Sequence, residues 1–112
     1  MRERLPDRRH SDVVRVVHRL RGGAQPYTAT IGYYPDGRIG EVFIDAAKDS
    51  NDGANLARDV AVLISLALQH GVPIEEMRAA MGRGEDSQPH SVAGAVLDAL
   101  AHEAMLAKKA PP

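Results

Sequence analysis

The sequence of 112 residues contains no cysteine. Disulfide bonds, a thiol nucleophile and a dithiol redox relay are therefore excluded from this chain, and so is a zinc site built on thiolates. Each of these needs a sulfhydryl group that the sequence does not supply. This absence restricts the chemistry of the chain more firmly than any other feature of its composition.

Long apolar runs and an excess of one charge are missing as well. No segment reaches the roughly 18 uncharged apolar residues of a membrane-spanning helix, and the first ten residues lack the apolar run of a signal peptide. We therefore expect a cytoplasmic protein without a membrane partner. The 14 Lys and Arg nearly balance the 15 Asp and Glu, so no global field attracts the chain to nucleic acid.

The sequence shows no recognisable metal, cofactor or catalytic motif. The five histidines are scattered, without the i, i+3 or i, i+4 pairs of a helical metal site. We therefore predict no metal, no cofactor and no catalytic residue. Lys48 is placed to meet an anion at the N-terminus of the helix that follows it, although Asp45, Asp49 and Asp52 act against such binding.

Three strands are predicted in the first half of the chain. Segment 11–20 has apolar residues at helical spacing, but its four β-branched valines in five positions favour a strand. Segments 27–34 and 39–45 follow. The sequence Pro-Asp-Gly at 35–37 supplies the fixed φ, the side-chain acceptor and the positive φ of a hairpin turn. Consecutive strands with short turns predict an antiparallel meander.

Three helices are predicted in the second half, at 54–70, at 74–81 and from 92 to about 108. The apolar stripe of the first exceeds half its circumference, so we expect this helix to be central. Its expected core-facing residues are Leu56, Ala57, Val60, Ala61, Leu63, Ile64, Ala67 and Leu68. The positions expected to face outward are Asn55, Arg58, Asp59, Val62, Ser65, Leu66 and Gln69.

The order of elements predicts an α+β fold, in which a three-stranded antiparallel meander is followed by three helices packed on one face. The 44% of apolar residues suffices for one core. We assign 1–10 to a flexible basic N-terminal arm, 11–108 to the single domain and 109–112 to a C-terminal tail.

Residues 66–80 have the helix, glycine turn and short helix of a DNA-reading motif. Glu75 and Glu76 would, however, lie where a recognition helix meets phosphates. We therefore interpret this segment as a corner between two packed helices, and nucleic acid is not an expected partner.

Two long motifs resemble the TSCPD domain family, which occurs at the C-terminus of cobalamin-dependent ribonucleotide reductases and as small stand-alone proteins. They are TATIGYYPDGRIGEVFI at 28–44 and ARDVAVLISLALQHGVP at 57–73. The similarity runs from about Leu5 to Leu100, and two long motifs in the right order make it specific. The family-motif positions within them are Pro35, Asp36, Gly37, Glu41 and Arg58.

The string that gives the family its name, Thr-Ser-Cys-Pro-Asp, is similar to Asp-Ser-Gln-Pro-His at 86–90. Ser87 and Pro89 agree, whereas Gln88 replaces the cysteine. The thiolate-bound metal suspected in the family therefore does not carry over. The glycine-rich stretch that the family tends to have around its lysine is also replaced, by alanines and acidic residues around Lys48.

The resemblance implies a link to deoxyribonucleotide synthesis. Ribonucleotide reduction itself needs a thiyl radical and a dithiol electron source, which a chain without cysteine does not provide. We therefore expect a non-catalytic accessory or regulatory module that acts by protein association. The candidate partners are a ribonucleotide reductase large subunit and a second copy of the chain, which would cover the apolar surplus of helix 54–70.

The alternative is a small nucleotide- or nucleic-acid-binding protein that uses the N-terminal arginines. The residues expected at a binding surface are Arg8, Arg9, Tyr34, Arg38 and Lys48.

Overall fold

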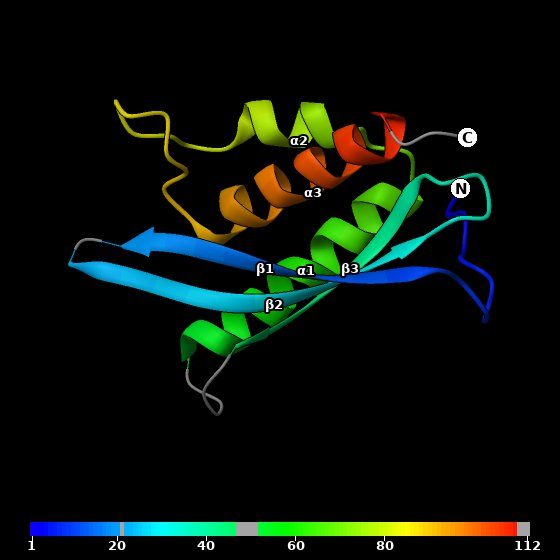
Figure 1. Cartoon of the computed structure of the whole chain (residues 1–112), viewed down its shortest axis with the longest axis horizontal. Coiled ribbons are helices and arrows are strands. Elements are labelled where there is room, and N and C mark those ends of the chain that lie inside the picture. Colours follow the sequence, from blue (N-terminus) through cyan, green and yellow to red (C-terminus); the bar gives the residue numbers. More distant parts are fainter. Residues whose placement is uncertain (21, 47–51, 110–112) are drawn as a thin grey trace.

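The structure, a computed structural model, describes residues 1–20, 22–46 and 52–109. Its strands form one antiparallel sheet in the order β1-β2-β3, and its helices follow the sheet in the chain (Figure 1). The predicted α+β fold is therefore confirmed. The elements are β1 (Ser11–Leu20), β2 (Gly23–Tyr33), β3 (Ile39–Ala46), α1 (Asp52–Gln69), α2 (Ile74–Ala80) and α3 (Val92–Lys109). No helix in these described ranges is long and apolar enough to cross a membrane.

The hairpin between β2 and β3 has the turn that the sequence predicts. Gly37 adopts a φ of 93°, a value that strains residues with a side chain. The backbone N–H of Tyr34 donates to the Arg38 carbonyl at 2.8 Å, and that of Gly37 donates to the Tyr34 carbonyl at 2.9 Å. Asp36 accepts the backbone N–H of Arg38 at 3.1 Å through its Oδ1 atom. The three turn residues thus fix the register of β2 against β3.

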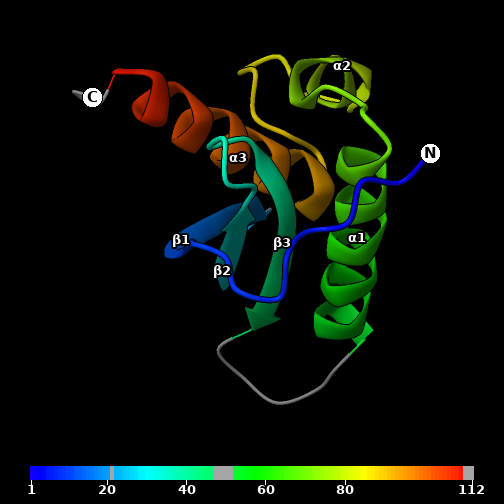
Figure 2. The same cartoon turned by 90° about the vertical axis from the view of Figure 1, so that its right-hand side faces the viewer.

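The core lies between the inner face of the sheet and two of the helices. Helix α1 packs against β3 and α3 packs against β1, while α2 packs against α3 rather than on the sheet. Figure 2 shows this arrangement with α1 alongside β3. The largest fully buried side chains are Ile31, Val42, Val96, Leu97 and Leu100. Side chains alternate between the two faces of a strand. Ile31 and Val42 therefore point toward the helices, and the opposite face of the sheet carries none of these fully buried side chains.

The predicted orientation of α1 is wrong at four positions. Leu56 and Leu63, expected in the core, are 61% and 67% exposed. The side of α1 that faces the sheet is instead formed by small residues and one isoleucine, namely Ala54, Ala57, Ala61 and Ile64. Ser65 and Gln69, expected to face outward, contact β3. Alanines allow the helix axis to approach the strand closely, and this rotation brings the two polar side chains to the sheet edge.

Ser65 and Gln69 provide hydrogen bonds to the outer edge of β3. The Val42 backbone N–H donates to Ser65 Oγ at 2.9 Å, and the same hydroxyl donates to the Val42 carbonyl at 3.1 Å. One turn later, Gln69 Nε2 donates to the Gly40 carbonyl at 3.0 Å. An edge strand otherwise exposes unpaired backbone groups that recruit another strand. Helix α1 therefore takes the place of a fourth strand at these positions.

The N-terminal arm lies against the end of α1 and against the hairpin. The Glu3 backbone N–H donates to the Gln69 carbonyl at 2.7 Å, and Arg2 Nε donates to Gln69 Oε1 at 2.6 Å. The Tyr34 hydroxyl donates to the Glu3 carbonyl. Gln69, which is only 5% exposed, thus joins the arm, α1 and β3. The flexibility assigned to residues 1–10 remains a prediction.

We predict that Ser65→Ala destabilises the fold by about 1–3 kcal/mol, because the two Val42 backbone groups lose their partner in a partly buried position. Urea unfolding followed by circular dichroism measures this change. Ser65→Thr retains the hydroxyl and is the control, so it should keep most of the stability. An unchanged free energy of unfolding in Ser65→Ala would show that water replaces the hydroxyl without cost.

Candidate functional site

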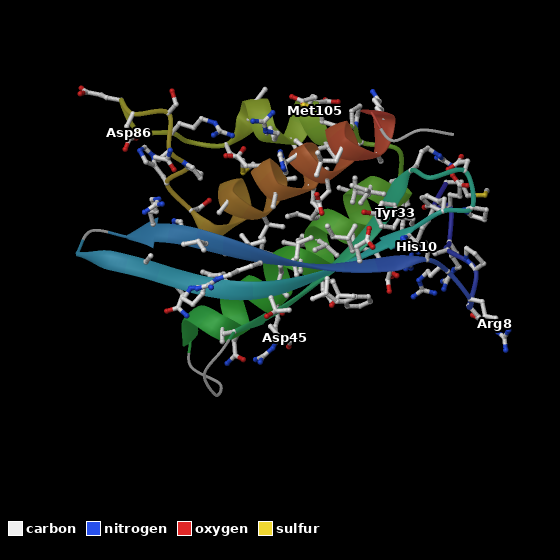
Figure 3. All side chains as sticks on the ribbon, viewed as in Figure 1. Arg8, His10, Tyr33, Asp45, Asp86 and Met105 are labelled. Atoms are coloured by element: carbon white, nitrogen blue, oxygen red, sulfur yellow. The ribbon has the colours of Figure 1, made fainter. Side chains whose placement is uncertain are left out.

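A cavity of about 660 Å³ lies at the hairpin end of the molecule. The arm, the hairpin and the last turns of α3 form its walls, and Figure 3 shows Arg8, His10 and Tyr33 at this end. We refer to it as the hairpin cavity. Its lining residues are Arg8, Arg9, His10, Asp12, Tyr33, Tyr34, Pro35, Gly37, Glu103, Leu106 and Ala107.

The structure brings together most of the residues that the sequence suggests for binding. Arg8, Arg9 and Tyr34 line the hairpin cavity, and Arg38 lies beside it with its guanidinium carbon 4.5 Å from the centre of the Tyr34 ring. Lys48 lies outside the described residues. The binding role of these residues remains a prediction, but their proximity is now established for four of them.

Tyr33 lines the hairpin cavity and stays protonated at neutral pH. Burial of its ring, a hydrogen bond with Asp12 and the negative charges of Asp12 and Glu103 raise the pKa of the Tyr33 hydroxyl to about 12. The His10 ring stacks obliquely on it, with the ring centres 5.3 Å apart. At neutral pH the phenol therefore acts as a hydrogen-bond donor and not as a base.

Arg9 is held by a carboxylate of the same chain. Its Nε atom donates to Glu41 Oε2, and its Nη2 atom donates to Glu41 Oε1 at 3.2 Å. Glu41 is only 7% exposed and lies opposite Gly32 in the register of β2 and β3. A side chain at Gly32 would collide with the Glu41 carboxyl group. The glycine therefore makes room for the ion pair that fixes Arg9.

Arg38 is paired in a similar way. Its Nε atom lies 2.7 Å from Asp36 Oδ2, and its Nη2 atom lies 3.0 Å from Glu3 Oε2. The hydrogen bonds with Glu3 and Asp36 raise the pKa of Arg38. The hydrogen bond from the Arg38 backbone N–H lowers the pKa of Asp36 most, and the hydrogen bond from the Arg38 side chain lowers it further. Of the two candidate arginines inside the cavity, Arg8 is the one that has no hydrogen bond or ion pair with a described residue.

The hairpin cavity therefore presents a mixed and largely neutralised surface. Two of its arginine neighbours, Arg9 and Arg38, are bound to carboxylates, and Asp12 and Glu103 add negative charge to its walls. Such a wall does not favour a phosphate group. In the described part of the chain, no three His, Asp or Glu side chains are grouped closely enough to hold a metal ion.

The segment that resembles the name-giving string of the family is tied to α3. The Arg83 guanidinium contacts both Asp98 oxygens, at 2.6 and 3.0 Å, and its Nη1 atom also donates to the Ser87 carbonyl at 3.1 Å. Arg78 Nε donates to Asp98 Oδ1 at 2.9 Å. Gln88 is exposed, and its backbone N–H donates to Asp86 Oδ1 at 3.0 Å. Hydrogen bonds therefore hold this loop against α3. Gln88 stands in it where the family has a cysteine.

Sequence reasoning missed the Arg83–Asp98 contact, because fifteen positions separate the two residues and neither falls in a motif.

The remaining family-motif residue, Arg58, lies on the surface of α1. Its Nε atom is 3.8 Å from Asp45 Oδ1, and its Nη1 atom donates to Asn55 Oδ1 at 3.3 Å. An exposed pair of this length contributes little to stability.

A second candidate site is the outer face of the sheet and its border with α1. Val13 of β1, Thr30 of β2 and Phe43 of β3 are paired in one row across the sheet, and Val13 and Phe43 are 67% and 53% exposed. A groove of about 530 Å³ between β3 and α1 continues this row to Val62, which is 55% exposed. We call Val13, Phe43 and Val62 the outer apolar surface. Charged residues, Arg2 and Arg58 among them, border the groove.

The fold and the loop at 83–90 define a small α+β domain. The model of the TSCPD domain matches residues 3–104, so the chain belongs to the TSCPD domain family. The predicted resemblance is confirmed.

The chain is similar to vitamin B12-dependent ribonucleotide reductases. It is 41% identical over 75 residues to the protein of Bradyrhizobium diazoefficiens, 43% identical over 75 residues to that of Agrobacterium fabrum and 38% identical over 74 residues to that of Rhodopirellula baltica. These alignments cover 66–67% of this chain but only 6–7% of the relatives. No solved structure matches the chain.

The Arg83–Asp98 contact generates a prediction about stability and pH. The hydrogen bond with Arg83, followed by that with Arg78, lowers the pKa of Asp98 from its usual 3.8. A carboxyl group whose pKa is lower in the folded state stabilises the fold fully above its unfolded pKa, and this contribution is lost as the pH falls through the folded pKa. We expect Asp98→Asn to lose about 1 kcal/mol of unfolding free energy at pH 7.

Urea unfolding of both proteins at pH 7 and at several values below pH 3.8 measures the effect, and the difference between them should shrink at acidic pH. Glu85→Gln is the control, because Glu85 is exposed and should give no difference at any pH. A constant difference at all pH values would mean that the charge of Asp98 does not contribute.

Proposed function

We propose that the chain is a cytoplasmic, non-catalytic accessory or regulatory module of deoxyribonucleotide synthesis, which acts by binding another protein. The observation that carries the proposal is the outer apolar surface. Val13 and Phe43 lie in one row of the sheet with Thr30 between them, and Phe43 and Val62 line one groove. Exposed large apolar side chains that gather on one face often mark a surface that a partner covers. An apolar centre with a charged border is also the usual composition of a protein interface.

The partner that we propose is the large subunit of a ribonucleotide reductase. In the relatives, the similar region is a small part of a long chain named vitamin B12-dependent ribonucleotide reductase. A region similar to this chain therefore occurs in one polypeptide with the remainder of that enzyme. The absence of cysteine supports a non-catalytic role for this chain, because thiyl radical chemistry needs a thiol.

Self-association is the second form of the same proposal. Leu56 and Leu63 project from α1 one heptad apart and are more than half exposed, so a second copy of α1 has an apolar ridge to pack against. The nucleotide-binding alternative has less support, because Arg9 and Arg38 are engaged by carboxylates of the same chain.

Binding is measured by isothermal titration of the purified chain with the purified ribonucleotide reductase large subunit of the same organism. We expect a saturable complex, and we expect Phe43→Thr and Val62→Gln to weaken it about tenfold each, since both remove apolar area from the contact. Multi-angle light scattering of the chain alone, with Leu63→Gln as the variant, tests for the homodimer.

Met105→Gln is the matched control for Val62→Gln. Both residues are exposed apolar positions on helices, at 50% and 55%, but Met105 lies on α3 (Figure 3) and does not line the groove that Phe43 and Val62 share. Equal weakening by the two variants, or a complete absence of binding together with a strict monomer, would overturn the proposal.

A further inference from the structure

The sheet has two edges, and the described residues cover only one of them. At the β3 edge, Ser65 and Gln69 of α1 provide hydrogen bonds to the strand. The other edge is β1, which pairs with β2 alone. In Figure 2, α1 lies alongside β3, and β1 is the outermost strand on the other side. We call the side of β1 that faces away from β2 the free edge.

The backbone groups at the free edge belong to every second residue of β1. The Tyr33 N–H donates to the His10 carbonyl at 3.0 Å, and the pairing of β1 with β2 continues from there without a register shift. Because the direction of hydrogen bonding alternates along a strand, the even-numbered residues of β1 bond to β2. Val13, Arg15 and Val17 therefore direct their N–H and C=O groups to the free edge. No described residue provides a partner for these groups.

β1 lacks the features that commonly protect an edge strand from pairing. Such strands are often short, bulged or interrupted by proline. β1 is ten residues long, contains no proline and keeps a regular register with β2. Its valines are β-branched and favour strand pairing. Val13 and Val17 are 67% and 41% exposed, so a strand added at the free edge covers apolar side chains as well as backbone groups.

The side chains on the outer face of β1 form a self-complementary pattern. Val13 and Val17 alternate there with Arg15 and Arg19. When two copies pair antiparallel with Val16 opposite Val16, each Arg15 lies opposite Val17 of the second copy. Each Val13 then lies opposite Arg19. No two arginines are opposite each other, and the aliphatic part of each arginine covers a valine. This pattern indicates a second copy of β1 as the added strand.

We propose that the chain forms a homodimer in which the two β1 strands pair antiparallel through their free edges. The two three-stranded sheets become one continuous sheet, with a two-fold axis perpendicular to it beside Val16. Such an axis keeps the outer apolar surfaces of both copies on the same face of the dimer. The groove between β3 and α1 lies at the opposite edge of each copy. The contact therefore goes beyond the proposed binding of the reductase subunit and does not depend on it.

Amide hydrogen exchange of the full chain, followed by nuclear magnetic resonance at several protein concentrations, tests the contact directly. The N–H groups of Val13, Arg15 and Val17 are free in the monomer and bonded in the dimer. We expect them to exchange at least about tenfold more slowly at high concentration than at low concentration. The N–H groups of Val14 and Val16, which bond to β2, are internal controls and should be protected throughout. Light scattering measures the mass over the same range.

Val17→Pro removes one N–H from the free edge and leaves the bonds to β2 in place, since an edge strand tolerates proline where its N–H faces solvent. We expect this variant to weaken the dimer at least about tenfold, because each copy loses a hydrogen bond to the other. Val17→Thr is the matched control. It retains the N–H and the β-branched shape, so it should dimerise as the parent chain does. The thermal unfolding midpoint shows whether both variants are folded.

Two charge variants test the register without a proline. Val17→Glu places a carboxylate opposite Arg15 of the second copy and should strengthen the dimer about fivefold. Val17→Lys places two positive charges opposite each other and should weaken the dimer by a similar factor. Leu63→Gln, at an exposed position of α1, should leave the protection of the free edge unchanged. This variant distinguishes the contact from the packing of α1 on α1.

Three results would overturn the proposal. They are a strict monomer at every concentration, a dimer that Leu63→Gln dissociates and Val17→Pro does not, and equal effects of Val17→Glu and Val17→Lys. The second result would show that α1 forms the dimer contact instead. None of the three bears on the titration with the reductase subunit, which measures a different surface.

Discussion

The unpaired backbone groups along the outer edge of β3 determine where α1 lies. Val42 and Gly40 would otherwise present free N–H and carbonyl groups to solvent or to another chain. Ser65 and Gln69, one helical turn apart, satisfy them at distances of 2.9 to 3.1 Å. Because these two contacts set the rotation of α1, they also decide which of its apolar residues enter the core.

Gln69 extends this constraint to the N-terminal arm. Its side chain accepts a hydrogen bond from Arg2 while its backbone carbonyl accepts one from Glu3, so the arm follows from the position of α1. The arm in turn brings Arg9 to Glu41. The carboxylate of Glu41 neutralises the positive charge of Arg9, which the sequence alone suggested for phosphate binding. The cavity beside the hairpin is therefore lined by residues that these folding contacts hold in place.

The rotation of α1 also accounts for the apolar surfaces that support association. With small residues such as Ala57 and Ala61 against the sheet, the larger Leu56 and Leu63 remain outside, and Val62 lies beside the groove that leads to Phe43. In the relatives, the similar region is a small part of a long reductase chain, and an exposed apolar surface on such a domain is suited to contact with another protein surface. Membership of the TSCPD family and the exposed row from Val13 to Phe43 therefore support one interpretation, that of a module acting through contacts.

The sequence by itself determined the order of the elements, the turn at Gly37 and the family, because strand alternation, turn residues and long motifs are local patterns. It also excluded thiol chemistry through composition. Only the tertiary structure decided that Leu63 is exposed while Gln69 is buried, and that Arg9 is paired with Glu41. These features depend on contacts between residues more than twenty positions apart, and periodicity within one element carries no information about the polar groups that another element presents to it.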